Sequence, residues 1–104
     1  VLVSSGSSVA PETFFPLTTD SIVGRDGGLA IALDDPRVSA RHAELNYRHD
    51  QWWLRDLGSS NGTMLNGRPV HSVVAVRSGD VLQFAAVRLR FVAPLVDQAE
   101  LQIA

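Results

Sequence analysis

Three short motifs carry the side chains of this chain that could do chemistry. They are Gly24-Arg25, Ser39-Ala40-Arg41-His42 and Ser59-Ser60-Asn61-Gly62-Thr63. Together they supply guanidinium groups, several hydroxyl groups and a side-chain amide, with no evident pair of nucleophile and base. Guanidinium and hydroxyl groups are good hydrogen-bond donors to phosphate oxygens. The motifs therefore suit the binding of a phosphate group better than the breaking of a bond.

The composition is that of one ordinary soluble domain. Its 104 residues are 45% hydrophobic and 19% charged, which allows a single core. We expect no membrane insertion, because the sequence contains neither an apolar run of about 18 residues nor a basic-then-apolar leader. The absence of cysteine excludes a disulfide framework and a thiolate metal site, and it fits the cytoplasm. The net charge of −2 and the scattered arginines lack the basic face of a nucleic-acid-binding protein.

Hydrophobic residues alternate with polar ones through most of the chain. The alternation is clearest in Ala43–Arg48 and Val87–Phe91, and it is typical of antiparallel strands with one buried face. Further short strands are predicted at residues 1–3, 14–15, 21–23, 29–33, 52–57, 73–76 and 81–84. Turn-forming residues separate these segments. The pattern predicts an all-β fold, an antiparallel β-sandwich of two twisted sheets with about 11 short strands.

Each of the three motifs falls on a loop of this predicted sandwich. We expect an even number of strands between Arg25, Ser39 and Ser60, which would bring their loops to one end of the sandwich. We assign residues 1–93 to the domain and residues 94–104 to a C-terminal tail, linker or short helix.

In this order and at this spacing, the motifs resemble those of the forkhead-associated (FHA) family. Asn66-Gly67 and the Ser78-Gly79-Asp80 turn extend the resemblance, which runs from residue 1 to about residue 92. It implies a non-catalytic module that binds phosphothreonine in a partner protein, a kinase or a kinase substrate, in Ser/Thr kinase signalling. The stretch of residues 33–39 also resembles bacterial members.

The resemblance assigns phosphopeptide contacts to four residues of the motifs. Arg25 is expected to hold the phosphate through its planar fork of N–H groups. Ser39 and Ser60 are expected to donate hydrogen bonds to the phosphate, and Asn61 to bind the peptide main chain. The alternatives are a solvated loop arginine, two turn serines and a simple Asn-Gly turn.

Two further arginines are candidates for the same surface. By resemblance, Arg37 could read the third residue after the phosphothreonine and favour an acidic residue there. It could equally be a solvated loop arginine beside Asp34 and Asp35. Arg41 could extend the positive surface or form an ion pair with Glu44.

The resemblance assigns loop geometry to a second set of residues: Gly24, His42, Gly62, Thr63, Asn66 and Gly67. His42 is expected to brace the loops through its ring nitrogens. We reject a catalytic role, because no carboxylate is spaced to orient His42, His49 or His71 beside a serine. Three dispersed histidines do not predict a metal site either, and we expect no cofactor.

The chain departs from the family pattern at three positions. Ala40 stands where family members often carry Lys, Arg or Asn that helps to hold the phosphate. A charge-assisted hydrogen bond contributes roughly 1.5–3 kcal/mol, so its loss would weaken binding by about tenfold or more. Ala30 replaces a usual Asp and Met64 a frequent aromatic residue. Because of Ala40, an interaction module that binds partners without phosphate remains the alternative function. The sequence offers no support for an enzyme.

Overall fold

Two β-sheets form the fold in the computed structural model, which describes residues 2–4, 14–17 and 20–92. The strands are β1 (Leu2–Ser4), β2 (Phe14–Phe15), β3 (Ser21–Gly24), β4 (Ile31–Ala32), β5 (Ala43–Arg48), β6 (Gln51–Asp56), β7 (Thr63–Leu65), β8 (Arg68–Pro69), β9 (Val74–Val76), β10 (Val81–Phe84) and β11 (Val87–Phe91). No helix occurs in these described residues, and so none that could span a membrane. The predicted tail at residues 94–104 lies outside them.

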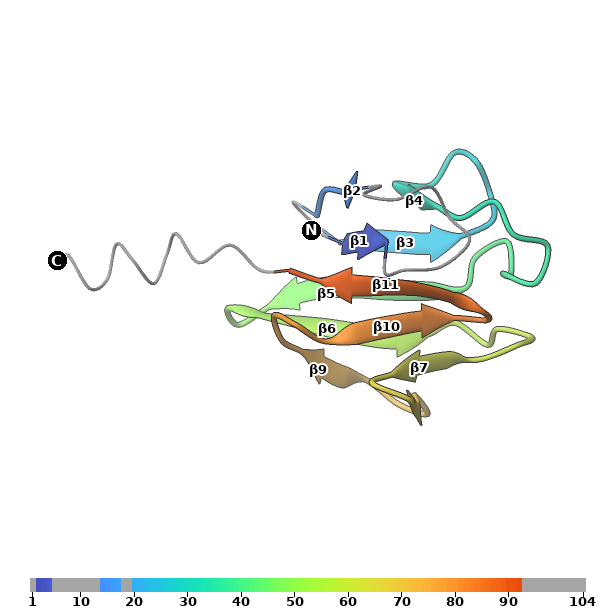
Figure 1. Cartoon of the computed structure of the whole chain (residues 1–104). Coiled ribbons are helices and arrows are strands. Elements are labelled where there is room, and N and C mark those ends of the chain that lie inside the picture. The colour runs from blue at the N-terminus through green and yellow to red at the C-terminus, as the bar shows by residue number, and fades with distance from the viewer. Residues whose placement is uncertain (1, 5–13, 18–19, 93–104) are drawn as a thin grey trace, which may run out of the picture.

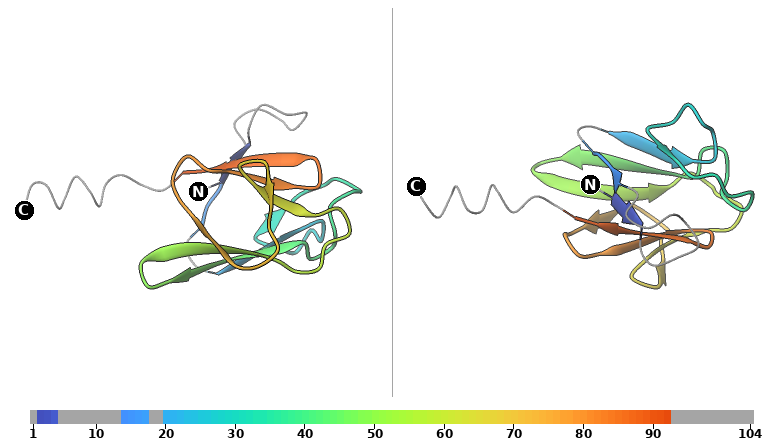
Figure 2. Two further views of the ribbon diagram at one scale, coloured as in Figure 1. Left: turned by 90° about the horizontal axis from the view of Figure 1, so that it is seen from below. Right: turned by 45° about the horizontal axis from the view of Figure 1, so that its top comes forward.

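The two sheets face each other as the layers of a sandwich. One sheet has six strands in the order β2-β1-β11-β10-β7-β8, and the other has five in the order β4-β3-β5-β6-β9. The left view of Figure 2 shows the two layers edge-on, with the orange β10 and β11 in one and the green β5 and β6 in the other. The predicted sandwich is therefore confirmed.

The core lies between the sheets and follows from the alternation in the sequence. In β11, Val87, Leu89 and Phe91 are buried, whereas Arg88 and Arg90 point to solvent. The other strands supply most of the remaining core residues: Val23, Ile31, Ala43, Leu45, Leu54, Val76, Leu82 and Phe84. The loops add Leu33, Val38 and Val70. Burial of these side chains from both sheets is the main force that holds the loops in fixed positions.

One strand pairing differs from the predicted antiparallel arrangement. β4 pairs with β3 in parallel, with Val23 opposite Ile31, whereas the other described pairs are antiparallel. Only β4 separates Arg25 from Ser39, so the expected even number of strands is wrong for this pair. Because β4 runs in the same direction as β3, both strands nevertheless end at the same edge. Two strands, β5 and β6, separate Ser39 from Ser60. The three loops therefore meet at one end of the sandwich, on the right in Figure 1.

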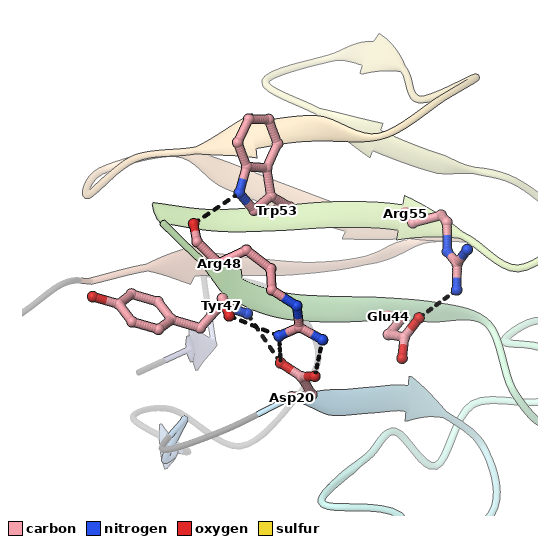
Figure 3. Close-up of polar contacts among 6 residues, drawn as sticks. All are labelled: Asp20, Glu44, Tyr47, Arg48, Trp53 and Arg55. Carbon is pink, nitrogen blue, oxygen red and sulfur yellow. Dashed lines mark hydrogen bonds and ion pairs between the residues drawn. The ribbon is translucent and has the colours of Figure 1, made fainter. Parts of the chain in front are cut away.

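The opposite end is closed by the β5–β6 hairpin and an ion pair. His49 and Asp50 both have positive φ, 56° and 61°, as a two-residue type I′ hairpin requires. Asp20 accepts hydrogen bonds from both Nη atoms of Arg48, at 2.9 and 2.7 Å (Figure 3). The side-chain hydrogen bond from Arg48 and the backbone hydrogen bond from Tyr47 lower the pKa of Asp20 to about 2. This cluster anchors the entry of β3 to the end of β5.

Candidate functional site

The three motif loops surround a pocket of about 250 Å³ at the end of the sandwich. Its lining consists of Arg25, Pro36, Arg37, Val38, Ser39, Ala40, Ser60 and Asn61. The predicted phosphopeptide contacts are therefore neighbours in space, although they come from three separate loops. Arg41 is the exception, because it is exposed and does not line the pocket.

Arg25 joins the first loop to the second. Its backbone N–H donates to the carbonyl of Ser39 at 2.9 Å, and its Nη1 donates to the carbonyls of Val38 at 2.8 Å and Pro36 at 3.2 Å. A guanidinium has five N–H donors, and those on Nε and Nη2 have no partner in the described part of the chain. The fork is thus held in place by one nitrogen while the other two can bind an anion.

Gly24 is required by the close approach of two backbone segments. A Cβ at this position would lie 2.1 Å from the carbonyl oxygen of Ala40 and 2.9 Å from Cδ1 of Leu29. Neither distance is possible for a real side chain, so only glycine lets the end of β3 run against residues 39–40. This contact sets Arg25 beside Ser39.

His42 and Ser39 connect the second loop to the third. The buried His42 ring accepts a hydrogen bond on Nδ1 from the backbone N–H of Ser39 at 3.1 Å. Nε2 lies 2.8 Å from the carbonyl oxygen of Gly62, so it carries the proton and donates to that oxygen. The ring also packs edge-on against Phe84. Because both ring nitrogens bind backbone groups, the geometry favours the predicted bracing role and leaves no nitrogen to act as a base.

The Ser39 hydroxyl has its proton available for a ligand. Its Oγ accepts a hydrogen bond from the backbone N–H of Ser60 at 3.1 Å. A hydroxyl can accept through its lone pairs and still donate its one proton, and no described group accepts that proton. Ser39 therefore links two loops and still offers a donor to the pocket.

Asn61 is oriented by the second loop. Its Nδ2 donates to the carbonyl oxygen of Arg37 at 2.6 Å, and its Oδ1 has no donor among the residues described. The next residue, Gly62, has a φ of +89°, which favours glycine. Asn61 thus lines the pocket with a side-chain carbonyl oxygen that could accept a hydrogen bond from a peptide N–H.

Asp56, at the end of β6, organises the third loop, and the sequence interpretation missed it. Its Oδ2 accepts from the backbone N–H groups of Gly58 and Ser59 at 2.9 and 3.0 Å. Its Oδ1 accepts from the hydroxyls of Ser59 and Thr63, both at 2.6 Å. Burial raises the pKa of Asp56, but the hydrogen bonds from Ser59, Thr63 and the backbone outweigh it and hold the pKa below its usual range. The signal was present in Asp56-Leu57-Gly58-Ser59, because an Asp commonly accepts hydrogen bonds from backbone N–H groups two and three residues later in a turn.

The two remaining arginine candidates have different surroundings. Arg37 borders the pocket and forms an ion pair with Asp35 at 3.3 Å. The side-chain hydrogen bond from Arg37 lowers the pKa of Asp35, and Asp35 raises the pKa of Arg37. The alternative pairing of Arg41 with Glu44 is wrong, because Glu44 instead binds Arg55 across the β5–β6 pair at 2.6 Å (Figure 3).

Asn66 and Gly67 lie outside the pocket, in the turn between β7 and β8. Both have positive φ, 51° and 82°. The Asn66 amide donates to Asp80 at 3.0 Å and accepts from the backbone N–H of Val81 at 2.8 Å. They shape this turn and tie it to β10. No cluster of three or more potential metal ligands exists within the described ranges.

Comparison with known proteins identifies the family. The model of the FHA domain matches residues 21–85, and this chain belongs to the FHA family. It is 43% identical over 68 residues to the glycogen accumulation regulator GarA of Mycobacterium tuberculosis, covering 65% of this chain and 41% of GarA. It is 44% identical over 68 residues to the oxoglutarate dehydrogenase inhibitor of Corynebacterium jeikeium, covering 65% of this chain and 46% of that protein. The chain thus spans less than half the length of these relatives.

Solved structures show the same fold. One, from a study of phosphothreonine-dependent FHA domain interactions, superposes with a TM-score of 0.77 at 28% identity, over 89% of this chain and 94% of that one. Another, Mycobacterium tuberculosis EmbR in complex with a low-affinity phosphopeptide, gives a TM-score of 0.75 at 27% identity, over 81% of this chain and 22% of EmbR.

Proposed function

We propose that this domain is a non-catalytic module that binds phosphothreonine in a partner protein in Ser/Thr kinase signalling. The observation that carries the proposal is the convergence of Arg25, Ser39, Ser60 and Asn61 on one pocket. Membership of the FHA family and the similarity to phosphothreonine-dependent and phosphopeptide-bound structures support it.

Each residue of the pocket has a distinct part in the proposed complex. The unpartnered Nε–H and Nη2–H of Arg25 bind two phosphate oxygens, as a guanidinium fork does best. The hydroxyls of Ser39 and Ser60 donate to the same group. The Asn61 amide accepts from a main-chain N–H of the peptide, which keeps the peptide extended across the loops.

The neighbours of the pocket tune this binding. The Ala40 side chain lines the pocket without offering a donor, so the phosphate relies on Arg25, the pocket arginine that has no acidic partner among the described residues. Arg37 would favour an acidic residue after the phosphothreonine, but its ion pair with Asp35 must be shared or broken first. Arg41, exposed beside the second loop, adds positive potential at longer range.

The proposal also covers the extent and setting of the domain. We assign residues 1–93 to it, because β1, β2 and β11 extend the sheet beyond residues 21–85, where the family model matches. The partner is a kinase or a kinase substrate, and the expected setting is the cytoplasm, which the absence of cysteine favours.

Calorimetric titration with three matched peptides tests the proposal. The peptides share one sequence and carry phosphothreonine, phosphoserine or unmodified threonine at the central position. We expect measurable binding of the phosphothreonine peptide and much weaker binding of the other two. Equal affinity for the phosphorylated and unmodified peptides would favour the alternative module that binds partners without phosphate.

Two variants test whether the phosphothreonine peptide binds at the pocket. Arg25→Ala and Ser39→Ala should each largely abolish binding of the phosphothreonine peptide. Arg68→Ala is the matched control, because Arg68 is an exposed arginine on β8 and does not line the pocket. If Arg25→Ala binds as well as the control, the assignment of the site is wrong even though the fold is right.

A further inference from the structure

The outer face of the six-stranded sheet is basic, although the whole chain carries a net charge of −2. The strands of this sheet contain no aspartate or glutamate, whereas the five-stranded sheet carries Glu44 and Asp56. Arg88 and Arg90 are exposed on β11. In Figure 1 this face is turned toward the viewer, with β10 and β11 in front of β5 and β6.

The two arginines stand side by side on this face. They are two residues apart in β11, so their side chains project to the same side of the sheet, about 7 Å apart. Val81 lies opposite Arg90 in the ladder and Gln83 lies opposite Arg88. The Gln83 side chain accepts from Nε of Arg88 at 3.3 Å and donates to the carbonyl of Ala85 at 2.9 Å. Gln83 thus orients Arg88 through Nε and leaves its two terminal nitrogens unoccupied.

Neither arginine has an acidic partner in the part of the chain that the structure describes. The three ion pairs there join Arg37, Arg48 and Arg55 to their acids. Asp80 precedes β10, but its carboxylate accepts from the Asn66 amide and from the backbone N–H of Arg77. The positive charges on β11 are therefore not neutralised within the described domain.

A hollow adjoins Arg88 on the same face. It has a volume of about 440 Å³ and is lined by Asn66, Gly67, Val81, Gln83 and Arg88. Its walls combine apolar, amide and cationic groups, which suits a short stretch of peptide with both apolar and acidic side chains.

We propose that this face is a second docking surface, which binds an extended acidic segment of a partner protein. In an extended segment, carboxylates two residues apart project to one side with the same spacing as Arg88 and Arg90. The terminal nitrogens of each arginine bind a carboxylate, and the hollow receives a neighbouring side chain. An acidic protein segment is favoured over a membrane or a nucleic acid, because two arginines on a net acidic domain are too few to hold a polyanionic surface.

An NMR titration of the full chain tests the proposal. The probe is a short synthetic peptide in which glutamate alternates with threonine, and its counterpart carries glutamine in place of glutamate. We expect the glutamate peptide to shift the amide signals of β10 and β11 and the glutamine peptide to have no effect. Shifts confined to the pocket around Arg25, or no shifts, would overturn the proposal. So would binding to phosphatidylserine vesicles without binding to the peptide.

A pair of variants separates this surface from the phosphothreonine pocket. R88E/R90E should weaken binding of the glutamate peptide by about tenfold or more, because two exposed charge pairs become repulsive. R55Q is the control and should bind as the native chain does, because Arg55 is an exposed arginine on β6 of the five-stranded sheet. R88Q/R90Q provides a second readout if the charge reversal disturbs folding, and it too should lose the peptide. Both double variants should bind a phosphothreonine peptide normally. If R88Q/R90Q binds the glutamate peptide as tightly as the native chain does, the proposal is contradicted.

Discussion

Replacing Asp56 by asparagine tests whether one carboxylate holds the third loop in shape. The carboxylate accepts four hydrogen bonds, two from the backbone of Gly58 and Ser59 and two from the hydroxyls of Ser59 and Thr63. Asparagine has the same shape but only one acceptor oxygen. In the variant, two of the four donors must face an NH₂ group, which cannot accept them.

The expected loss of stability follows from these two bonds. A hydrogen bond to a charged group contributes roughly 1.5–3 kcal/mol. Asp56 is partly exposed, so water can replace part of the loss, and we expect Asp56→Asn to lower the free energy of unfolding by about 2–4 kcal/mol. For a domain of this size, the midpoint of thermal unfolding should fall by at least about 8 °C. Phosphopeptide affinity should also fall, because Ser60 and Asn61 lie on the same loop.

Urea denaturation at neutral pH measures the effect. Asp26→Asn is the matched control, because among the described residues its carboxylate accepts only from the backbone N–H of Gly28, at 3.0 Å, on an exposed loop. We expect the control to lose less than about 0.5 kcal/mol. An Asp56→Asn domain as stable as the Asp26→Asn control would refute the role of Asp56 as the centre of the loop.

The role of Asp56 can also be tested by measuring how the stability of both chains depends on pH. The folded-state pKa of Asp56 lies below the usual value of 3.8, because the hydrogen bonds outweigh burial. Its stabilising contribution is therefore fully present above pH 3.8 and is lost as the pH falls through the lower folded-state value. The difference in stability between the native chain and Asp56→Asn should narrow in acid below this pH. A difference that stays constant at lower pH would contradict the assignment.

Three further predictions concern other contacts. Gly24→Ala should destabilise the domain by about 1–3 kcal/mol, because the new Cβ meets the Ala40 carbonyl. Gly27→Ala is the control, since a Cβ there has no atom within 4 Å. Equal urea midpoints for the two variants would contradict the prediction. Ala40→Arg should tighten phosphothreonine-peptide binding by about tenfold, and unchanged calorimetric affinity would show that Ala40 is not a missing contact. The pKa of Asp20, about 2, means that its bond to Arg48 stabilises the fold above pH 3.8 and is lost as the pH falls toward 2. Asp20→Asn should therefore flatten the acid limb of the unfolding profile, and an unaltered limb would argue against the ion pair.

Much of the fold could be predicted because its signals are local. Alternation of polar and apolar residues marks each long strand, and turn residues mark where each strand ends. The direction of β4 could not be predicted in this way. Ile31–Ala32 has two residues, too few for a pattern, and its parallel pairing with β3 depends on how the loop folds back from Gly24.

For the candidate site, the residues could be predicted from the sequence, but their contacts could not. The motif residues around the pocket were identifiable from their types and order. Their mutual contacts were not, because they join positions far apart in the chain, such as the bond from the Asn61 amide to the Arg37 carbonyl. Arg41 was predicted at the pocket because it lies within the second motif. Its side chain does not line the pocket, so a residue's place in a motif does not settle where its side chain lies.

The most direct measurement is a map of amide chemical shifts while a phosphothreonine peptide is added to the ¹⁵N-labelled chain. Binding at the pocket predicts that the largest shifts fall on residues 24–26, 37–42 and 59–62, and that the unmodified peptide leaves these signals in place. Shifts spread over β5 and β6 instead, or identical shifts with both peptides, would contradict phosphothreonine binding at this end of the sandwich.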